Sequence, residues 1–108
     1  MTDVAATMQT VPTTLAQIQA SLAAHRDELT GRYHLSELGV FGSYVHGKQH
    51  ASSDIDILVA FHITPSLFTL IALEDELRDL LGTNVDVAVK SALRPHIGVH
   101  ILREVVPI

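Results

Sequence analysis

The chain has 108 residues, which fits one domain and leaves little room for two. It contains no cysteine, which excludes disulfides, thiolate catalysis and cysteine zinc sites, and its net charge of -5 comes without a cluster of Lys and Arg. We therefore expect no direct nucleic-acid binding, because such binding rests on clustered cations that neutralise phosphates.

The sequence carries no signal for secretion or for a membrane. Residues 1–14 lack the basic start and the apolar core of a signal peptide. No apolar run reaches the ~20 residues that a membrane-spanning helix needs. We expect a cytoplasmic protein with no membrane association.

The composition also bears on partners. Apolar residues make up 47% of the chain and charged residues only 18%, against about a quarter in an average protein. A small domain of this kind leaves apolar surface uncovered, and such surface often marks an interface. We expect a homo- or hetero-oligomer, with a well-packed monomer as the alternative.

The N-terminal part divides into a tail and a helix. Residues 1–12 are small and polar and indicate a flexible tail, so that residues 13–108 form a single folded domain. Thr14 and Gln17 have the spacing of a capping box, which starts a helix, and Gly31 is expected to end it. One face of this helix carries Leu15, Ile18, Leu22, Arg26 and Leu29.

Two strands follow, joined by a polar segment. Residues 38–41 predict a short strand that runs into Gly42-Ser43. Residues 44–53 are polar and predict a short helix or turn followed by a loop. Residues 54–61 predict the next strand, which is apolar on much of both faces.

The second half of the chain alternates in the same way. Thr64-Pro65 is expected to open a helix that Gly82 ends. Residues 84–89 predict a third strand and residues 95–105 a final helix, after which Pro107 ends the ordered structure. The apolar stripe of the helix before Gly82 consists of Leu70, Leu73, Leu77, Leu80 and Leu81.

Strands that alternate with helices predict one sheet covered by helices. The expected fold class is α/β (α+β), with a small mixed β-sheet and helices mainly on one face.

Two aspartates at the start of the strand over residues 54–61 carry the strongest chemical signal. Because side chains alternate along a strand, Asp54 and Asp56 share one face, roughly 6.5–7 Å apart, opposite Ile55 and Ile57. Such acids are costly to desolvate, and no Lys or Arg lies within five residues of them. Divalent ions such as Mg²⁺ take oxygen ligands and keep positions open for phosphate. The pair therefore indicates a metal site, with two water-exposed aspartates as the alternative.

Gly42-Ser43 is a candidate phosphate site. Glycine lets the backbone approach a ligand closely, and successive N–H groups at a helix start bind anions. Ser43 adds a hydroxyl donor. An ordinary turn in which Ser43 caps the helix is the alternative.

These two features form one long pattern, in which ten residues separate Gly42-Ser43 from Asp54. Residues 41–47 and 52–59 resemble the signature of the DNA polymerase beta-like nucleotidyltransferases. They are most similar to the smallest branch of that superfamily, the minimal nucleotidyltransferase (MNT) domains.

The resemblance extends over residues 35–107. Val85-Asp86-Val87 stands at the place of the third carboxylate of the family. Residues 93–107 are similar to its C-terminal helix and tail. The implied fold is the polymerase-beta-like nucleotidyltransferase core, with residues 13–108 as the nucleotidyltransferase domain.

The resemblance assigns the nucleotide contacts. Gly42 and Ser43 would hold the β- and γ-phosphates of ATP, and Ser53 would be a further nucleotide-binding residue.

It also assigns the catalytic and metal-binding carboxylates, which are Asp54, Asp56 and Asp86 with two Mg²⁺ ions. Asp86 would in addition help to deprotonate the acceptor hydroxyl. Alternation supports this independently, because Asp86 faces away from Val85 and Val87 and can converge with the other two across neighbouring strands. The alternative for Asp86 is an acid at a strand edge.

The chain departs from its family in the loop. Many relatives carry Arg where this chain has Tyr44 and His46. Lys48 is then the fixed cation of the loop, because histidine is neutral near pH 7. A triphosphate transition state benefits from positive charge, so this departure favours weakened catalysis.

His96 and His100 have i, i+4 spacing on the predicted final helix. They lack the Glu of a His-Glu-x-x-His motif and a third ligand at suitable spacing. We interpret them as surface or interface residues rather than as zinc ligands.

A domain of this length leaves no room for a second lobe that would enclose a small acceptor. The MNT resemblance implies that a partner protein supplies the acceptor, namely the HEPN toxin of a toxin–antitoxin pair. We expect transfer of AMP from ATP to a tyrosine hydroxyl of that toxin, so that the protein acts as its antitoxin. Two alternatives stay open: a non-catalytic antitoxin that works by binding, and a nucleotidyltransferase for a small molecule such as an aminoglycoside.

Overall fold

The computed structural model describes residues 12–50 and 52–108. The tail predicted for residues 1–12 lies outside this range, apart from Pro12. The described residues form three α-helices, two short 3-10 helices and four strands. In chain order these are α2 (Leu15–Tyr33), β1 (Leu35–Phe41), η1 (Gly42–Tyr44), β2 (Ile55–Phe61), α3 (Leu67–Leu81), β3 (Val85–Val89), η2 (Lys90–Ala92), α4 (Pro95–Glu104) and β4 (Val106–Pro107).

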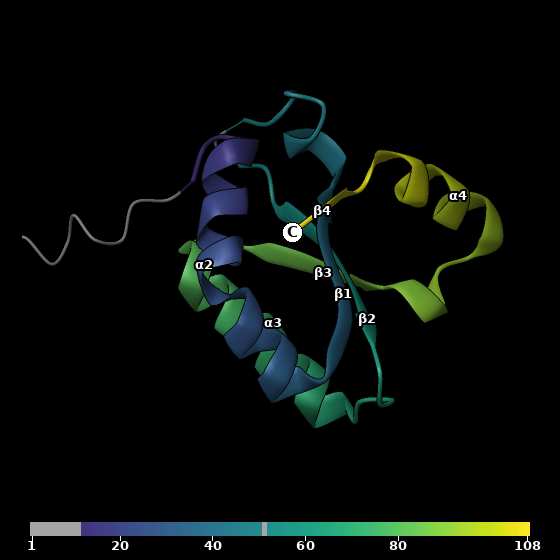
Figure 1. The fold of residues 1–108 in the computed structure, drawn as a ribbon. Coiled ribbons are helices and arrows are strands. Elements are labelled where there is room, and N and C mark those ends of the chain that lie inside the picture. Colours follow the sequence, from purple (N-terminus) through teal and green to yellow (C-terminus); the bar gives the residue numbers. More distant parts are fainter. Residues whose placement is uncertain (1–11, 51) are drawn as a thin grey trace, which may run out of the picture.

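The strands form one mixed sheet in the order β3-β2-β1-β4. β1 pairs antiparallel with β2 and with β4, whereas β2 and β3 are parallel. The parallel pair requires a crossover connection, which α3 provides. Figure 1 shows α2 and α3 together on one side of the sheet and α4 on the other side. The predicted fold class, a small mixed sheet with helices mainly on one face, is confirmed.

The hydrophobic core lies between the sheet and the two long helices. Ile55, Ile57 and Val59 of β2 are fully buried, as the alternation along that strand predicts. The helices contribute Ile18, Leu22, Leu29, Leu73, Leu77 and Leu81 to the same cluster. This packing leaves the opposite face of the sheet available for polar side chains.

The start of α2 agrees with the prediction, but its end does not. The Thr14 side chain accepts a hydrogen bond from the Gln17 backbone N–H, and the capping box is complete. Gly31 does not end the helix, which continues to Tyr33 and is capped by His34 in the left-handed conformation, with φ 57°.

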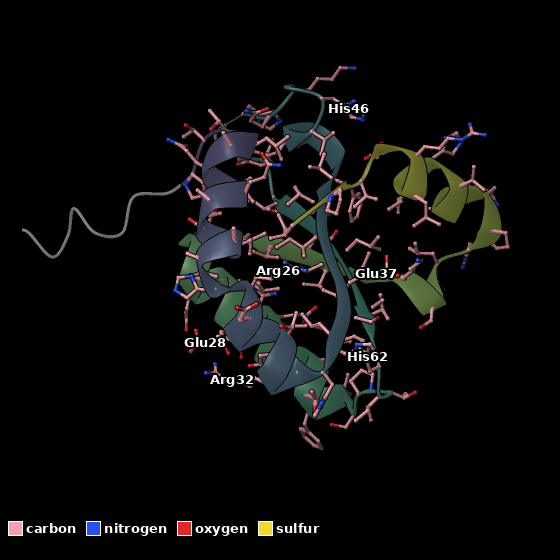
Figure 2. The ribbon with its side chains drawn as sticks, in the orientation of Figure 1. Arg26, Glu28, Arg32, Glu37, His46 and His62 are labelled. Atoms are coloured by element: carbon pink, nitrogen blue, oxygen red, sulfur yellow. The ribbon has the colours of Figure 1, made fainter. Side chains whose placement is uncertain are left out.

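A tertiary contact explains the longer helix. Tyr33 is buried, and its hydroxyl donates a hydrogen bond of 2.7 Å to Glu76 on α3. Arg32 donates to the same carboxylate at 2.6 Å and pairs with Glu28 on its own helix (Figure 2). These bonds require the last turn of α2 to be helical. A prediction from Gly31 alone does not take such contacts with another helix into account.

Two further boundaries differ from the predictions. β1 begins at Leu35 rather than at residue 38. α3 begins at Leu67, where Ser66 caps it through the Thr69 N–H, rather than at Thr64-Pro65. The predicted end of α3 is confirmed, because Gly82 caps it with φ 69°.

The sequence did not predict the last strand, β4, which ends at Pro107, the residue expected to end the ordered structure. Val106 and Pro107 form β4, which pairs with Val40 and Gly39 of β1. A Cβ on Gly39 would lie 2.7 Å from Val105 Cγ2, so the absence of a side chain there admits the C-terminal segment. A two-residue strand has no periodic pattern, and only its pairing with β1 defines it.

Within the described part of the chain, no helix combines the length and the apolar character required to cross a membrane.

The corrected end of α2 predicts the effect of Gly31→Ala. Gly31 lies inside the helix, and an added Cβ meets nothing within 4 Å. The substitution is expected to raise the free energy of unfolding in urea by about 1 kcal/mol, because alanine restricts the unfolded chain and favours helix. Gly82→Ala, at a positive φ, is the contrasting control and is expected to lower it by about 1 kcal/mol. A loss of stability in Gly31→Ala would contradict the observed helix end.

Candidate active site

The strand register brings two of the predicted carboxylates together. Asp56 of β2 lies directly opposite Asp86 of β3 in the parallel pair. Side chains at paired positions of neighbouring strands point to the same face of the sheet. Asp54 immediately precedes β2, two residues from Asp56. The three carboxylates therefore occur at one end of the sheet, on the face opposite the core residues Ile55 and Ile57.

The Gly42-Ser43 turn lies against this cluster. β1 ends at Phe41, which pairs with Asp56, and the chain then turns into η1. Gly42 has φ 82°, a left-handed conformation that favours glycine. A Cβ at Gly42 would collide with the carboxylate of Asp56. The turn predicted to bind phosphate and the strand predicted to bind metal are thus in direct contact.

The electrostatics of this region centre on Asp56. Burial, together with the negative charges of Asp86, Asp54 and Glu104, raises the pKa of Asp56 to about 6. The ion pairs of residues 12–50 and 52–108 include none of the three aspartates. The cluster therefore carries negative charge that no neighbouring cation balances.

The donor set suits a divalent ion, although it is not a closed metal cage. Across the two described ranges, no group of three His, Cys, Asp or Glu side chains is arranged to hold an ion by itself. Mg²⁺ is usually held by one or two carboxylates together with water and substrate phosphates. The oxygen ligands and the uncompensated charge around Asp56 fit that open kind of site.

Glu104, at the end of α4, was not identified from the sequence. Its carboxylate accepts a 2.6 Å hydrogen bond from the Gly42 backbone N–H and lies 3.0 Å from His46 Nε2. The hydrogen bond with His46 is the main reason that the pKa of Glu104 is lowered. The helix on the far side of the sheet therefore reaches the same turn as Asp56.

The remaining loop residues have defined structural roles. Ser53 Oγ accepts a hydrogen bond of 2.9 Å from the His50 N–H, which closes the loop before β2. Tyr44 is buried in the core, and the cap of η1 is Phe41, so Ser43 is not a cap. Tyr44 is thus a packing residue in this chain.

The other predicted polar pair is not part of this site. His96 and His100 are exposed on α4, as expected for surface residues. His46 and His62 also lie far apart, at opposite ends of the sheet (Figure 2).

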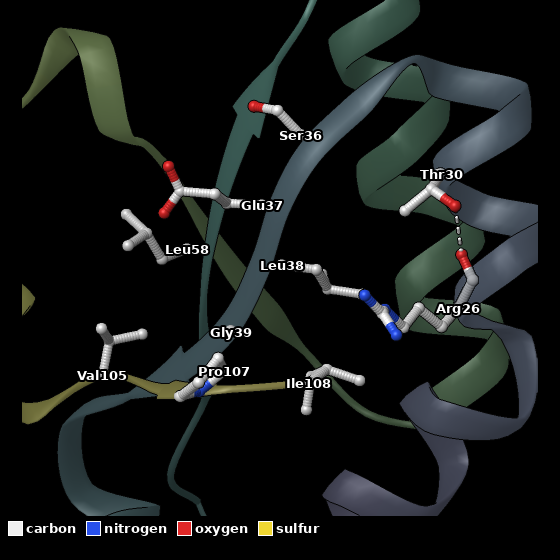
Figure 3. Close-up of a pocket in the computed structure, with 10 residues that line it drawn as sticks. All are labelled: Arg26, Thr30, Ser36, Glu37, Leu38, Gly39, Leu58, Val105, Pro107 and Ile108. Atoms are coloured by element: carbon white, nitrogen blue, oxygen red, sulfur yellow. Dashed lines mark hydrogen bonds between the residues drawn. The ribbon is translucent and has the colours of Figure 1, made fainter.

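The two described cavities do not contain the carboxylate cluster. One, of about 190 Å³, lies between α2 and the edge of the sheet, and Arg26 points from α2 towards β1 within it (Figure 3). The other, of about 470 Å³, is lined by residues at the end of β2 away from Asp54, including Phe61 and Pro65. The acidic site is an open surface rather than an enclosed pocket.

Comparison with known proteins identifies the family. The family model of the nucleotidyltransferase domain matches residues 22–107. This chain belongs to the nucleotidyltransferase domain family. The enzyme class predicted from the Gly-Ser and Asp-x-Asp pattern is therefore confirmed.

Relatives of this nucleotidyltransferase agree with that assignment. The chain is 50% identical over 93 residues to the protein adenylyltransferase MntA of Thermococcus cleftensis. This alignment covers 86% of this chain and 94% of the relative. A solved minimal nucleotidyltransferase is 33% identical, with a TM-score of 0.70, over 86% of this chain and 90% of its own. One chain of the solved complex of a tri-AMPylated Shewanella oneidensis HEPN toxin with an MNT antitoxin has the same fold. It is 20% identical, with a TM-score of 0.62 over 83% of this chain and 70% of its own.

The contact between the turn and Asp56 predicts the effect of Gly42→Ala. The new side chain strains the left-handed backbone and collides with the Asp56 carboxylate. We expect the free energy of unfolding in urea to fall by more than the roughly 1–2 kcal/mol of backbone strain alone. Gly47→Ala is the matched control, because Gly47 also has a positive φ, at 69°, but has open space around its Cβ position. Equal losses in the two variants would contradict the contact.

The raised pKa of Asp56 predicts a pH dependence of stability. The folded state binds a proton at Asp56 near pH 6, and the unfolded chain does so near the ordinary pKa of 3.8. Between these values the folded state binds more protons than the unfolded state does. Asp56 therefore lowers the free energy of unfolding as the pH rises from about 4 to about 6, and the full loss is present above that range.

Asp56→Asn is therefore expected to raise the melting temperature at about pH 8 in EDTA, with little change at about pH 4. Thermal unfolding across this range measures the difference between variant and wild type. The exposed substitution Asp79→Asn on α3 serves as the control. A variant that melts below wild type at the higher pH would contradict the charge repulsion.

Proposed function

We propose that this protein is a Mg²⁺-dependent protein adenylyltransferase of the cytoplasm. It transfers AMP from ATP to a tyrosine hydroxyl of a partner HEPN toxin and thereby acts as the antitoxin. The observation that carries the proposal is the contact between Gly42 and the Asp56 carboxylate, because it joins a candidate phosphate turn to a candidate metal ligand. The name of the 50% identical relative, a protein adenylyltransferase, supports the same reaction.

The proposed roles follow the geometry of the site. Gly42 and Ser43 bind the β- and γ-phosphates, and Ser53 supports the nucleotide from the loop before β2. Asp54, Asp56 and Asp86 hold two Mg²⁺ ions, which neutralise phosphate charge and orient the triphosphate when bound. The like charges around Asp56 support this role, because bound cations would relieve the repulsion.

The reaction replaces the phosphoanhydride bond between the α- and β-phosphates of ATP by a phosphoester bond to the tyrosine. The tyrosine oxygen attacks the α-phosphorus of ATP and forms a new P–O bond. The bond between that phosphorus and the oxygen bridging to the β-phosphate breaks, and pyrophosphate leaves with the bonding electron pair. Asp86, which is exposed beside Asp56, accepts the tyrosine proton.

The shape of the site favours a protein acceptor over a small molecule. The two described cavities lie away from the carboxylates, so neither encloses a small acceptor beside Asp86. An open site is accessible to a residue presented by another protein. The solved toxin–antitoxin complex with the same fold contains an AMPylated toxin, which supports this choice of acceptor.

The direct test is transfer of AMP to a purified HEPN partner. Toxin incubated with this protein, ATP and Mg²⁺ is expected to gain mass in AMP units, as measured by intact-mass spectrometry. EDTA is expected to abolish the gain. Asp56→Asn is expected to lower the rate by at least roughly a hundredfold, and Asp79→Asn should retain it. No gain with intact partner, nucleotide and metal would overturn the proposed reaction.

A cellular experiment separates catalysis from binding alone. Asp54→Asn combined with Asp56→Asn should still form the toxin complex but fail to protect cells. Full protection by this double variant would favour the non-catalytic antitoxin, for which the lack of Arg at Tyr44 and His46 is the motivating observation.

A further inference from the structure

The Glu104 carboxylate makes two contacts that the proposed reaction does not use. It accepts a hydrogen bond from the Gly42 N–H at 2.6 Å and lies 3.0 Å from His46 Nε2. These two partners stand at the beginning and the end of one tight turn. Glu104 is 62 and 58 residues away from them in the sequence, so only the folded chain creates this contact.

The strand register explains why Glu104 reaches this position. β4 pairs antiparallel with β1, with Pro107 opposite Gly39 and Val106 opposite Val40. If this register continued for two more residues, it would place Glu104 opposite Gly42. At that point the C-terminal segment is already helical, because α4 ends at Glu104. The side chain of Glu104 therefore supplies the acceptor that a continued strand would have provided through its backbone.

This bond holds the turn on one side, and the Asp56 carboxylate lies against the turn on the other side. Gly42 lies between the Glu104 carboxylate, which binds its N–H, and the Asp56 carboxylate, which occupies the space of its missing side chain. Hydrogen bonds to a charged acceptor are about twice as strong as those between neutral groups. The pKa of Glu104 is lowered, mainly by the bond with His46, so the acceptor is ionised at neutral pH.

We propose that Glu104 is a positioning residue of the nucleotidyltransferase reaction. Its carboxylate holds the segment from Gly42 to His46 in the shape that receives the triphosphate. Because Glu104 accepts the Gly42 N–H, Gly42 contributes the close approach of its backbone to the phosphates, and Ser43 contributes the hydrogen-bond donors. The inference rests on the proposed function, because it assigns the Gly42-Ser43 turn to phosphate.

The opposite interpretation makes a different prediction. If the Glu104 carboxylate stood in for a phosphate oxygen, the nucleotide would have to displace it, and its removal would tighten binding. The register of β4 against β1 argues for positioning, because the carboxylate completes a ladder between protein segments. Nucleotide affinity therefore decides between the two interpretations.

The experiment uses the full chain in four forms: wild type, Glu104→Ala, Glu104→Gln and the control Glu28→Gln. Glu28 is an exposed acid on α2 that pairs with Arg32, so its substitution makes the same chemical change far from the turn. Calorimetry measures the affinity for a non-hydrolysable ATP analogue with Mg²⁺. Thermal unfolding measures stability, and steady-state kinetics with the toxin give kcat and the KM for ATP.

Glu104→Ala is expected to weaken binding of the analogue, and to raise the KM for ATP, by roughly tenfold to a hundredfold, the range for losing a hydrogen bond to a charged group. We expect a smaller loss in kcat. Glu104→Gln keeps an acceptor for the Gly42 N–H and should stay within about threefold of wild type. Glu28→Gln should match wild type. This rescue by glutamine separates positioning from a general loss of stability.

Unchanged or tighter binding of the analogue by folded Glu104→Ala would overturn the inference. If Glu104→Ala does not fold, Glu104→Gln carries the test through the amide proton of Gly42. That proton should remain protected from exchange in Glu104→Gln, and its loss of protection with unchanged analogue binding would equally overturn the inference.

The outcome is separable from that of the proposed function. If the wild-type protein binds the analogue but transfers no AMP, the proposed reaction is rejected. The affinities of the variants for the analogue still test the role of Glu104. Wild type that transfers AMP, together with an alanine variant of unchanged KM, would reject the role of Glu104 alone.

Discussion

The main physical constraint on the candidate site is a group of negative charges that no neighbouring cation balances. Asp56 is half-buried between the Gly42 turn and β3, and the carboxylates of Asp86, Asp54 and Glu104 all act on it. Repulsion of this kind costs stability, and the apolar core on the opposite face of the sheet supplies the stability that offsets it. This end of the sheet is the candidate site, and the core determines which face of the sheet carries it.

The two faces of the sheet therefore have different tasks. α2 and α3 bury the apolar side of β2, whereas α4 lies on the other side and brings Glu104 to the turn after β1 (Figure 1). β4 links the two faces, because its pairing with β1 follows directly after α4, whose last residue, Glu104, accepts the Gly42 N–H. A strand of two residues thus sets the geometry around a glycine that is distant in the sequence.

Family membership identifies a nucleotidyltransferase, and the structure shows what two residues of the loop after β1 do. Tyr44 is a core residue, so its side chain cannot act as a substitute for a phosphate-binding Arg. His46 is paired with Glu104 and does not balance the aspartates. The described residues therefore place no positive charge beside the aspartates, which is consistent with the proposal that metal ions bind there.

The sequence by itself determined the features that depend on neighbouring residues. The capping box of Thr14 and Gln17, the Gly82 cap and the alternation that separates Asp56 from Ile57 all follow from spacings of a few residues. The Gly-Ser and Asp-x-Asp pattern also indicated the family, through its resemblance to a known signature that lies within one segment of the chain. Tertiary structure decided the rest. The extension of α2 past Gly31 required Glu76 on another helix, the opposition of Asp56 and Asp86 required the parallel register, and the position of Glu104 required β4. These features arise from contacts between distant segments, whose register and packing no local pattern encodes.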